Sequence, residues 1–198
     1  MCFTRFKINR LIKKLKAMQQ NRVHNPVNDE ILKKEIAGYK KLASIYQSLH
    51  GKKKYPFAYE MKLECYRAAA MLDDSNSQFL LGKALLEEAR FRQELQQNGV
   101  FANPSNERQS HQLYEEAHAY LITAEKLNNI EAKRLYGLCY INGWGVPSDK
   151  KKGFDLIVDS IEQENSWDKV PQIFASMGLN KPEFFSALTQ HRNSNRTL

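Results

Sequence analysis

Long apolar runs are missing from this chain of 198 residues, and so is the apolar core of a secretion signal. A membrane-spanning helix needs about 18 or more consecutive apolar residues, and no stretch of the sequence approaches that length. Basic residues are instead scattered through the N-terminal region, where a secretion signal would be apolar. We therefore expect a cytoplasmic protein, with peripheral association with a membrane left open as an alternative.

Cysteines are few and odd in number, at positions 2, 65 and 139. Regular spacings within an even set would indicate a disulfide framework or a metal site, and this set indicates neither. Cys65 and Cys139 both fall inside stretches with helical spacing. We expect reduced thiols in a cytosolic compartment.

Strand-like alternation is missing as well, because apolar residues recur at helical spacing throughout 29–164. The predicted fold class is therefore all-α, with seven or eight helices in antiparallel pairs and no sheet. The chain is of single-domain size, and its 42% hydrophobic content suits one elongated domain.

The most regular stretch is 132–164, where two helical patterns flank a glycine-rich turn. Leu138 and Cys139 follow helical spacing in the first pattern. Gly143 can adopt the positive φ that ends a helix, and Ser148 or Asp149 can cap the next helix, as Asn28 or Asp29 can cap the helix at the start of the repeat domain. The second helix is therefore expected to fold back antiparallel on the first.

Eight residues of this stretch occupy the positions of a known repeat pattern: Ala132, Gly137, Tyr140, Gly143, Gly145, Val146, Asp149 and Lys152. With them the stretch resembles a Sel1-like repeat, a relative of the tetratricopeptide repeat (TPR). The resemblance implies a short α-solenoid, a right-handed stack of helical hairpins that binds proteins and has no catalytic residues. The stretch departs from the family at Tyr136 (leucine in the family), Gly153 (alanine), Leu156 (an aromatic residue) and Ser160-Ile161 (an alanine pair), which predicts looser helix packing there.

Two earlier segments repeat this pattern in weaker form. The resulting domain organisation has a basic helix at 1–22 and a repeat domain at 29–191, made of units at about 38–73, 77–128 and 132–164 and a helical cap at 167–191. The polar tail after residue 191 is expected to be frayed.

The second unit is longer than the first by 16 residues, measured between equivalent positions. We place these extra residues after Leu85, where the helix is expected to continue to about Gln97 and a loop at 98–109 to follow, with the helix resuming near Ser110. An insertion inside a repeat must run over the surface of the stack. We therefore predict that this segment is the most mobile internal part of the chain and sensitive to partners.

Acidic residues are missing from 3–20, where apolar residues recur on one face of a helix. Residues 1–54 carry a net charge of +11 and the remainder −3. Two interpretations stay open. In the first, the apolar stripe caps the first repeat; in the second, the helix tethers the protein to an acidic surface. Among such surfaces we rank an acidic protein first, anionic lipid second and nucleic acid third. The basic residues that would make this contact are Arg5, Lys7, Arg10, Lys13, Lys14 and Lys16.

Nothing in the sequence indicates catalysis or a bound cofactor. Glu115 and His118 have the spacing used in carboxylate-bridged metal sites, but the further glutamates that such a site needs are not evident. Gly143-Trp144-Gly145 follows a helix and lacks the third glycine of a nucleotide-binding loop. We predict that the protein is not an enzyme and assign no catalytic, cofactor-binding or metal-binding residue.

The predicted function is a non-catalytic protein-interaction scaffold, an adaptor or chaperone-like subunit of a larger complex. Basic and aromatic side chains on the first helix of each unit would suit partner proteins with acidic or partly apolar segments, although Phe79 is equally suited to packing between helices. The alternative is a peripheral membrane or nucleic-acid binder acting through the N-terminal helix. The candidate groove residues are Tyr39, Lys40, Ser44, Gln78, Phe79, Lys83, Lys133 and Arg134.

Overall fold

The computed structural model describes residues 2–24, 28–99, 102–179 and 181–196, and every regular element within these ranges is helical. The predicted all-α class is confirmed for them. The same ranges hold nine α-helices, more than the predicted seven or eight, because the region after Glu164 forms two of them and a short 3-10 helix. The elements are α1 (Cys2–His24), α2 (Asp29–Leu49), α3 (Ala58–Ala70), α4 (Ser75–Asn98), α5 (Pro104–Lys126), α6 (Ile130–Asn142), α7 (Lys150–Gln163), η1 (Trp167–Lys169), α8 (Val170–Ser176) and α9 (Pro182–Arg196).

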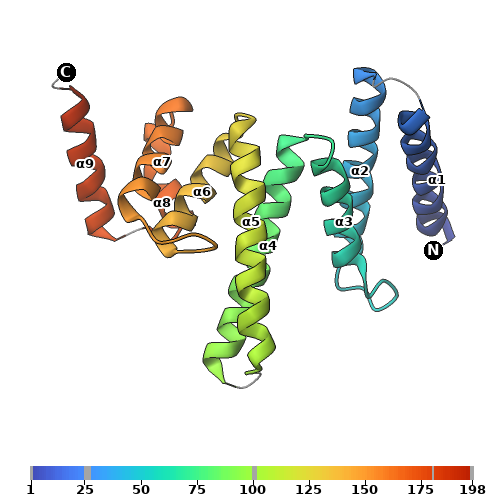
Figure 1. The fold of residues 1–198 in the computed structure, drawn as a ribbon, viewed down its shortest axis with the longest axis horizontal. Coiled ribbons are helices and arrows are strands. Elements are labelled where there is room, and N and C mark those ends of the chain that lie inside the picture. The colour runs from blue at the N-terminus through green and yellow to red at the C-terminus, as the bar shows by residue number, and fades with distance from the viewer. Residues whose placement is uncertain (1, 25–27, 100–101, 180, 197–198) are drawn as a thin grey trace.

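The helices follow one another in chain order along the long axis of the molecule, from α1 at one end to α9 at the other (Figure 1). The most extensive contacts join α2 to α3, α4 to α5 and α6 to α7, so that each predicted unit spans one of these pairs. Adjacent pairs meet through α3 against α4 and through α5 against α6. Contacts are therefore mostly between neighbours in the sequence, as in repeat architectures.

Three groups of buried side chains make up the core, and they follow the same order along the molecule. Tyr66 packs against both the first group, on α1 to α3, and the second, on α4 to α6. Leu135 and Trp144 pack against both the second and the third, which reaches from α6 to α9. The core is therefore continuous through shared side chains.

Polar side chains cap five of the helices. Each accepts a hydrogen bond from a backbone N–H of the first helical turn at 2.8–2.9 Å, which satisfies a donor that the helix itself leaves unpaired. The predicted capping roles of Asn28 and Asp149 are confirmed. The cap residues, in chain order, are Asn28, Asp74, Asn103, Asn129 and Asp149.

The loop predicted at 98–109 is wrong in its extent, because most of this segment is helical. Helix α4 ends at Asn98, next to the predicted end at about Gln97, and Gly99 follows it with a φ of 75°, but α5 begins at Pro104, well before Ser110. Proline suits the first turn of a helix, where its missing N–H is not needed, and Asn103 caps that turn. The extra residues lengthen both helices, so the α4–α5 hairpin projects beyond its neighbours (Figure 1).

The chain beyond Glu164 closes the far end of the core. Phe174 of α8 is fully buried, with its ring centroid 6.3 Å from that of Phe154 on α7 and 5.3 Å from that of Phe185 on α9. Helix α9 runs to Arg196, so the frayed tail predicted from residue 192 is wrong up to that point. The basic helix predicted at 1–22 continues to His24, and the parts of the predicted linker and loop at 25–27 and 100–101 lie outside the described residues.

The glycine-rich turn after α6 is pressed against α5. Gly143 ends α6 with a φ of 72°, and Gly145 has a φ of 70°. A Cβ atom on Gly145 would lie 2.3 Å from the carbonyl oxygen of Tyr114, closer than any side chain permits. Glycine is therefore required at this position both for its backbone conformation and for the close approach to α5.

Helices α6 and α7 also approach each other through glycine. A Cβ atom on Gly137 would lie 2.6 Å from the carbonyl oxygen of Gly153, and one on Gly153 would lie 2.4 Å from that of Gly137. The looser packing predicted for Gly153 is therefore wrong. Because neither residue carries a side chain, the two backbones come closer than alanine would allow.

The apolar stripe of α1 packs against α2. Ile8 and Leu15 are buried together with Leu42 and Tyr46, so the structure places this stripe in the core.

A buried carboxylate lies in the same α1–α2 interface. The Glu35 side chain is only 1% exposed, and its Oε2 accepts a hydrogen bond from Arg22 Nε at 3.2 Å. Its Oε1 is also buried and makes no hydrogen bond to the described residues. Arg22 is therefore the charge partner that makes the burial of this carboxylate tolerable.

The glycine turn should be far more sensitive to substitution than an unpacked glycine with the same backbone conformation. Gly51 has a φ of 76°, and a Cβ atom added to it would meet nothing within 4 Å, so Gly51→Ala should cost only the backbone strain, about 1 kcal/mol. Gly145→Ala adds a backbone clash and should cost about 3 kcal/mol or more of unfolding free energy. Urea denaturation of both variants checks this, and equal costs would contradict the packing described.

Removing the partner of the buried carboxylate should loosen α1. Arg22→Ala leaves Glu35 charged and unpaired in the interface and should cost about 3 kcal/mol of unfolding free energy. The double variant Arg22→Met/Glu35→Met should recover most of this loss, since it removes both charges. Denaturation curves of the three proteins measure the effect, and a single variant as stable as the wild type would show that the pair does not hold α1.

Candidate protein-binding surfaces

The candidate groove residues on α2 and α4 have different surroundings in the structure. Lys40 forms an ion pair with Asp74 at 3.3 Å, and Gln78 is buried and donates a hydrogen bond to the carbonyl of Ala70 at 3.2 Å. Tyr39 and Phe79 are half-buried against the first and second core groups. The exposed members of the set are Ser44 and Lys83.

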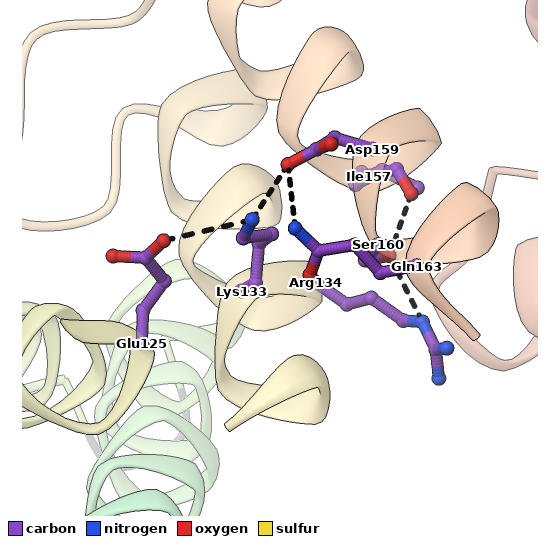
Figure 2. Close-up of polar contacts among 7 residues, drawn as sticks. All are labelled: Glu125, Lys133, Arg134, Ile157, Asp159, Ser160 and Gln163. Carbon is purple, nitrogen blue, oxygen red and sulfur yellow. Dashed lines mark hydrogen bonds and ion pairs between the residues drawn. The ribbon is translucent and has the colours of Figure 1, made fainter. Parts of the chain in front are cut away.

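The two candidate residues on α6 lie in a polar network that joins three helices (Figure 2). Lys133 Nζ lies 2.6 Å from Asp159 on α7 and 3.7 Å from Glu125 on α5. Arg134 Nε donates to the Ser160 hydroxyl at 3.1 Å. Only 12% of the Lys133 side chain and 14% of the Arg134 side chain are exposed. Both cations therefore hold helices together within the chain.

The Arg134 guanidinium extends the network to the C-terminal end of α7. It pairs with the carboxylate of Glu164, which caps that end of the helix. The Ser160 hydroxyl, in turn, donates to the carbonyl of Ile157 at 2.6 Å (Figure 2). A ligand that used Lys133 or Arg134 would have to displace these carboxylates. Binding by the eight groove residues stays a prediction, and Ser44 and Lys83 are the members best placed for it.

The six basic residues predicted to contact an acidic surface are all exposed on α1. The apolar stripe that shares the helix is turned toward α2, so the exposed face of α1 is dominated by positive charge. Electrostatic contact is therefore available to a partner without rearrangement. These residues are Arg5, Lys7, Arg10, Lys13, Lys14 and Lys16.

A cleft that the sequence analysis missed lies beside the glycine turn. It has a volume of about 290 Å³ and is formed by the distal half of the α4–α5 hairpin and the end of α6. Amide and hydroxyl groups predominate in its lining, together with an imidazole and two large aromatic rings. The lining residues are Gln93, Gln96, Gln97, Glu107, Ser110, His111, Tyr114, Asn142, Gly143 and Trp144.

Trp144 holds the base of this cleft in place. Its ring is parallel to that of Tyr114, with an interplanar angle of 3° and centroids 5.6 Å apart, and the Arg90 guanidinium lies 5.4 Å from its centroid. The Tyr114 hydroxyl donates to Gln93 Oε1 at 2.8 Å, and burial raises the pKa of this phenol to about 12. Sequence reasoning treated Trp144 as part of a turn because the cleft exists only once three helices meet.

A second polar cluster joins α5, α6 and α7. Lys152 Nζ donates to the Tyr140 hydroxyl at 2.7 Å, and the Tyr136 hydroxyl lies 3.1 Å from the same oxygen. The pKa of Tyr140 is lowered most by the hydrogen bond from Lys152 and next by the one from Tyr136. Burial, in contrast, raises the pKa of Tyr136. The His118 ring lies 5.2 Å from that of Tyr136, and burial lowers its pKa.

The thiols of Cys65 and Cys139 are buried in the core. Burial raises the pKa of Cys65 and of Cys139 to about 12, so both thiols stay protonated at neutral pH. No three His, Cys, Asp or Glu side chains among the described residues are grouped so that they could hold a metal ion. Likewise, no helix in this part of the chain is long and apolar enough to cross a membrane.

No family model matches the chain, and no curated protein matches it significantly.

The contact between Lys152 and Tyr140 should be visible in a pH titration. The lysine charge favours the phenolate, so Lys152→Met should raise the pKa of Tyr140. The ultraviolet absorbance of phenolate, followed against pH, should show one tyrosine ionising at lower pH in the wild type than in the variant. Lys151→Met, which removes an exposed charge on the same helix, is the matched control and should leave the curve almost unchanged. Identical curves for all three proteins would contradict the contact.

Proposed function

We propose that this protein is a non-catalytic protein-interaction scaffold, built as a short α-solenoid of the Sel1-like or TPR-like kind. The observation that carries the proposal is the polar cleft beside Trp144, which lies between the distal half of the α4–α5 hairpin and the end of α6. Helices that pair in chain order support the solenoid, and the protonated thiols at Cys65 and Cys139 support a non-catalytic role.

The lining of the cleft suits a polypeptide backbone. A side-chain amide offers one acceptor and two donor hydrogens, which match the C=O and N–H groups of an extended segment. Two of the four amides are already oriented within the protein: Gln93 accepts from Tyr114, and Gln96 Oε1 accepts from the N–H of Asn103 at 2.8 Å. Groups held in place before binding lose less conformational entropy when a ligand arrives.

The second candidate function is docking to an anionic surface through α1. The exposed basic face supports it, and a protein partner ranks above a lipid one because the apolar stripe that would insert into a bilayer is packed on α2. Nucleic acid ranks third, because the remainder of the chain carries a net charge of −3.

The cleft can be tested with exposed residues that leave the core intact. Gln97→Ala/His111→Ala removes two lining side chains, and Gln109→Ala/Gln112→Ala is the matched control on the same hairpin, outside the cleft. In quantitative affinity purification from the native cell, the cleft variant should lose at least one protein that the control retains, with recovery lower by about tenfold. Identical protein sets for the wild type and both variants would refute binding at the cleft.

Point variants are also better than deletion for testing α1. Removing residues 1–22 would uncover Leu42 and Tyr46, so any loss of partners would be confounded by unfolding. Charge reversal at Lys13 and Lys16, both exposed, leaves the packed stripe in place. Partners that depend on α1 should be lost from this variant and from the wild type at high salt, whereas partners bound at the cleft should remain.

A further inference from the structure

A groove of about 270 Å³ runs between α1 and α2 at the basic end of the molecule. Its α1 side is formed by Leu11, Leu15 and Met18, which are spaced along one face of the helix. Its α2 side carries Ala37 and Gly38. Apolar side chains of α1 and two small residues of α2 therefore form the floor of the groove.

Gly38 explains why a groove forms here. A Cβ atom on this residue would lie 2.7 Å from Leu15 Cδ2, so Leu15 packs directly against the α2 backbone. The small side chain of Ala37 beside this contact does not fill the adjacent space, and it is exposed. Apolar atoms of Leu11 and Met18 therefore remain partly accessible on either side of the buried Leu15.

Three lysines border the groove. Lys14 comes from α1, and Lys34 and Lys41 come from α2. Lys34 pairs with Glu30 one turn away, in an exposed contact at 2.5 Å. Lys14 and Lys41 form no ion pair with the described residues, and no carboxylate lines the groove. The uncompensated charge sits directly beside apolar surface that a partner could cover.

We propose that this groove binds an acidic amphipathic helix of a partner protein. Apolar side chains of that helix would enter the floor between Leu11 and Met18, and its acidic side chains would meet Lys14 and Lys41. A flat lipid surface fits less well, because the accessible apolar atoms lie in the groove between two helices. The proposal rests on the proposed scaffold function and names the chemistry of one partner.

Selection from a displayed library tests this directly. The library holds amphipathic helical segments of about 20 residues whose polar faces are acidic, neutral or basic. The full-length wild-type protein should enrich acidic members with apolar residues at helical spacing. The double variant Lys14→Glu/Lys41→Glu should bind the enriched segments about tenfold or more weakly than the wild type. Fluorescence anisotropy with the synthetic peptides measures this affinity. Lys52→Glu/Lys53→Glu makes the same change in charge on the exposed turn before α3 and should have little effect.

A second pair of variants tests the apolar floor without altering charge. Ala37→Trp should fill the groove and block the selected peptides, whereas Ala119→Trp places the same bulk at an exposed position on α5 and should not. Circular dichroism and melting curves establish that all variants are folded. If acidic segments are not enriched, or if they bind the groove variants as well as the wild type, the proposal is wrong.

Anionic vesicles separate a protein partner from a lipid one. If Lys14→Glu/Lys41→Glu loses binding to phosphatidylserine vesicles but keeps binding to the selected acidic peptides, the groove docks lipid and the proposal is overturned. Loss of binding to the peptides would support it. The cleft variant Gln97→Ala/His111→Ala should leave this peptide selection unchanged, so failure at the groove and failure of the scaffold function at the cleft can be told apart.

Discussion

Direct contact between backbones is the constraint on which the centre of this structure depends. Gly145 brings the turn after α6 against the Tyr114 carbonyl, and Gly137 and Gly153 bring α6 against α7. With these contacts in place, Trp144 stacks on Tyr114 and contacts both of the neighbouring core groups. The cleft beside the hairpin exists because the turn is held at this distance. Glycine here therefore sets the geometry of a surface as well as the end of a helix.

Charge is used in two different ways along the molecule. In the centre, Lys133 and Arg134 are largely covered and bind carboxylates of the same chain, so they stabilise the arrangement of α5, α6 and α7. At the N-terminal end, Lys14 and Lys41 lie at the surface beside apolar atoms and form no such ion pair with the residues that the structure describes. Cations of the first kind are poorly suited to ligands, whereas those of the second kind can attract an acidic partner at no cost to the fold.

The packing of α1 on α2 links the fold to the proposed docking. An amphipathic helix that lay free would offer its apolar stripe to a membrane, but here Ile8 and Leu15 are already buried. The Arg22–Glu35 pair adds a specific polar contact to the same interface. What remains exposed is a basic face and a groove lined by apolar side chains, and this combination supports the proposed protein partner over a lipid surface.

Local chemistry made much of the fold predictable from the sequence. Helical spacing indicated the all-α class, and Asn28 and Asp149 were identified as caps because such residues satisfy free N–H groups wherever a helix starts. Residues 98–109 were misread as a loop, because their polar composition suits both a loop and the exposed end of a long hairpin. Helices distant in the sequence decide whether Lys133 faces solvent or a carboxylate. They also decide whether Trp144 only forms part of a turn or supports a cleft. The sequence by itself therefore determined the helices and their order, and only the tertiary structure decided which of their side chains remain available to a partner.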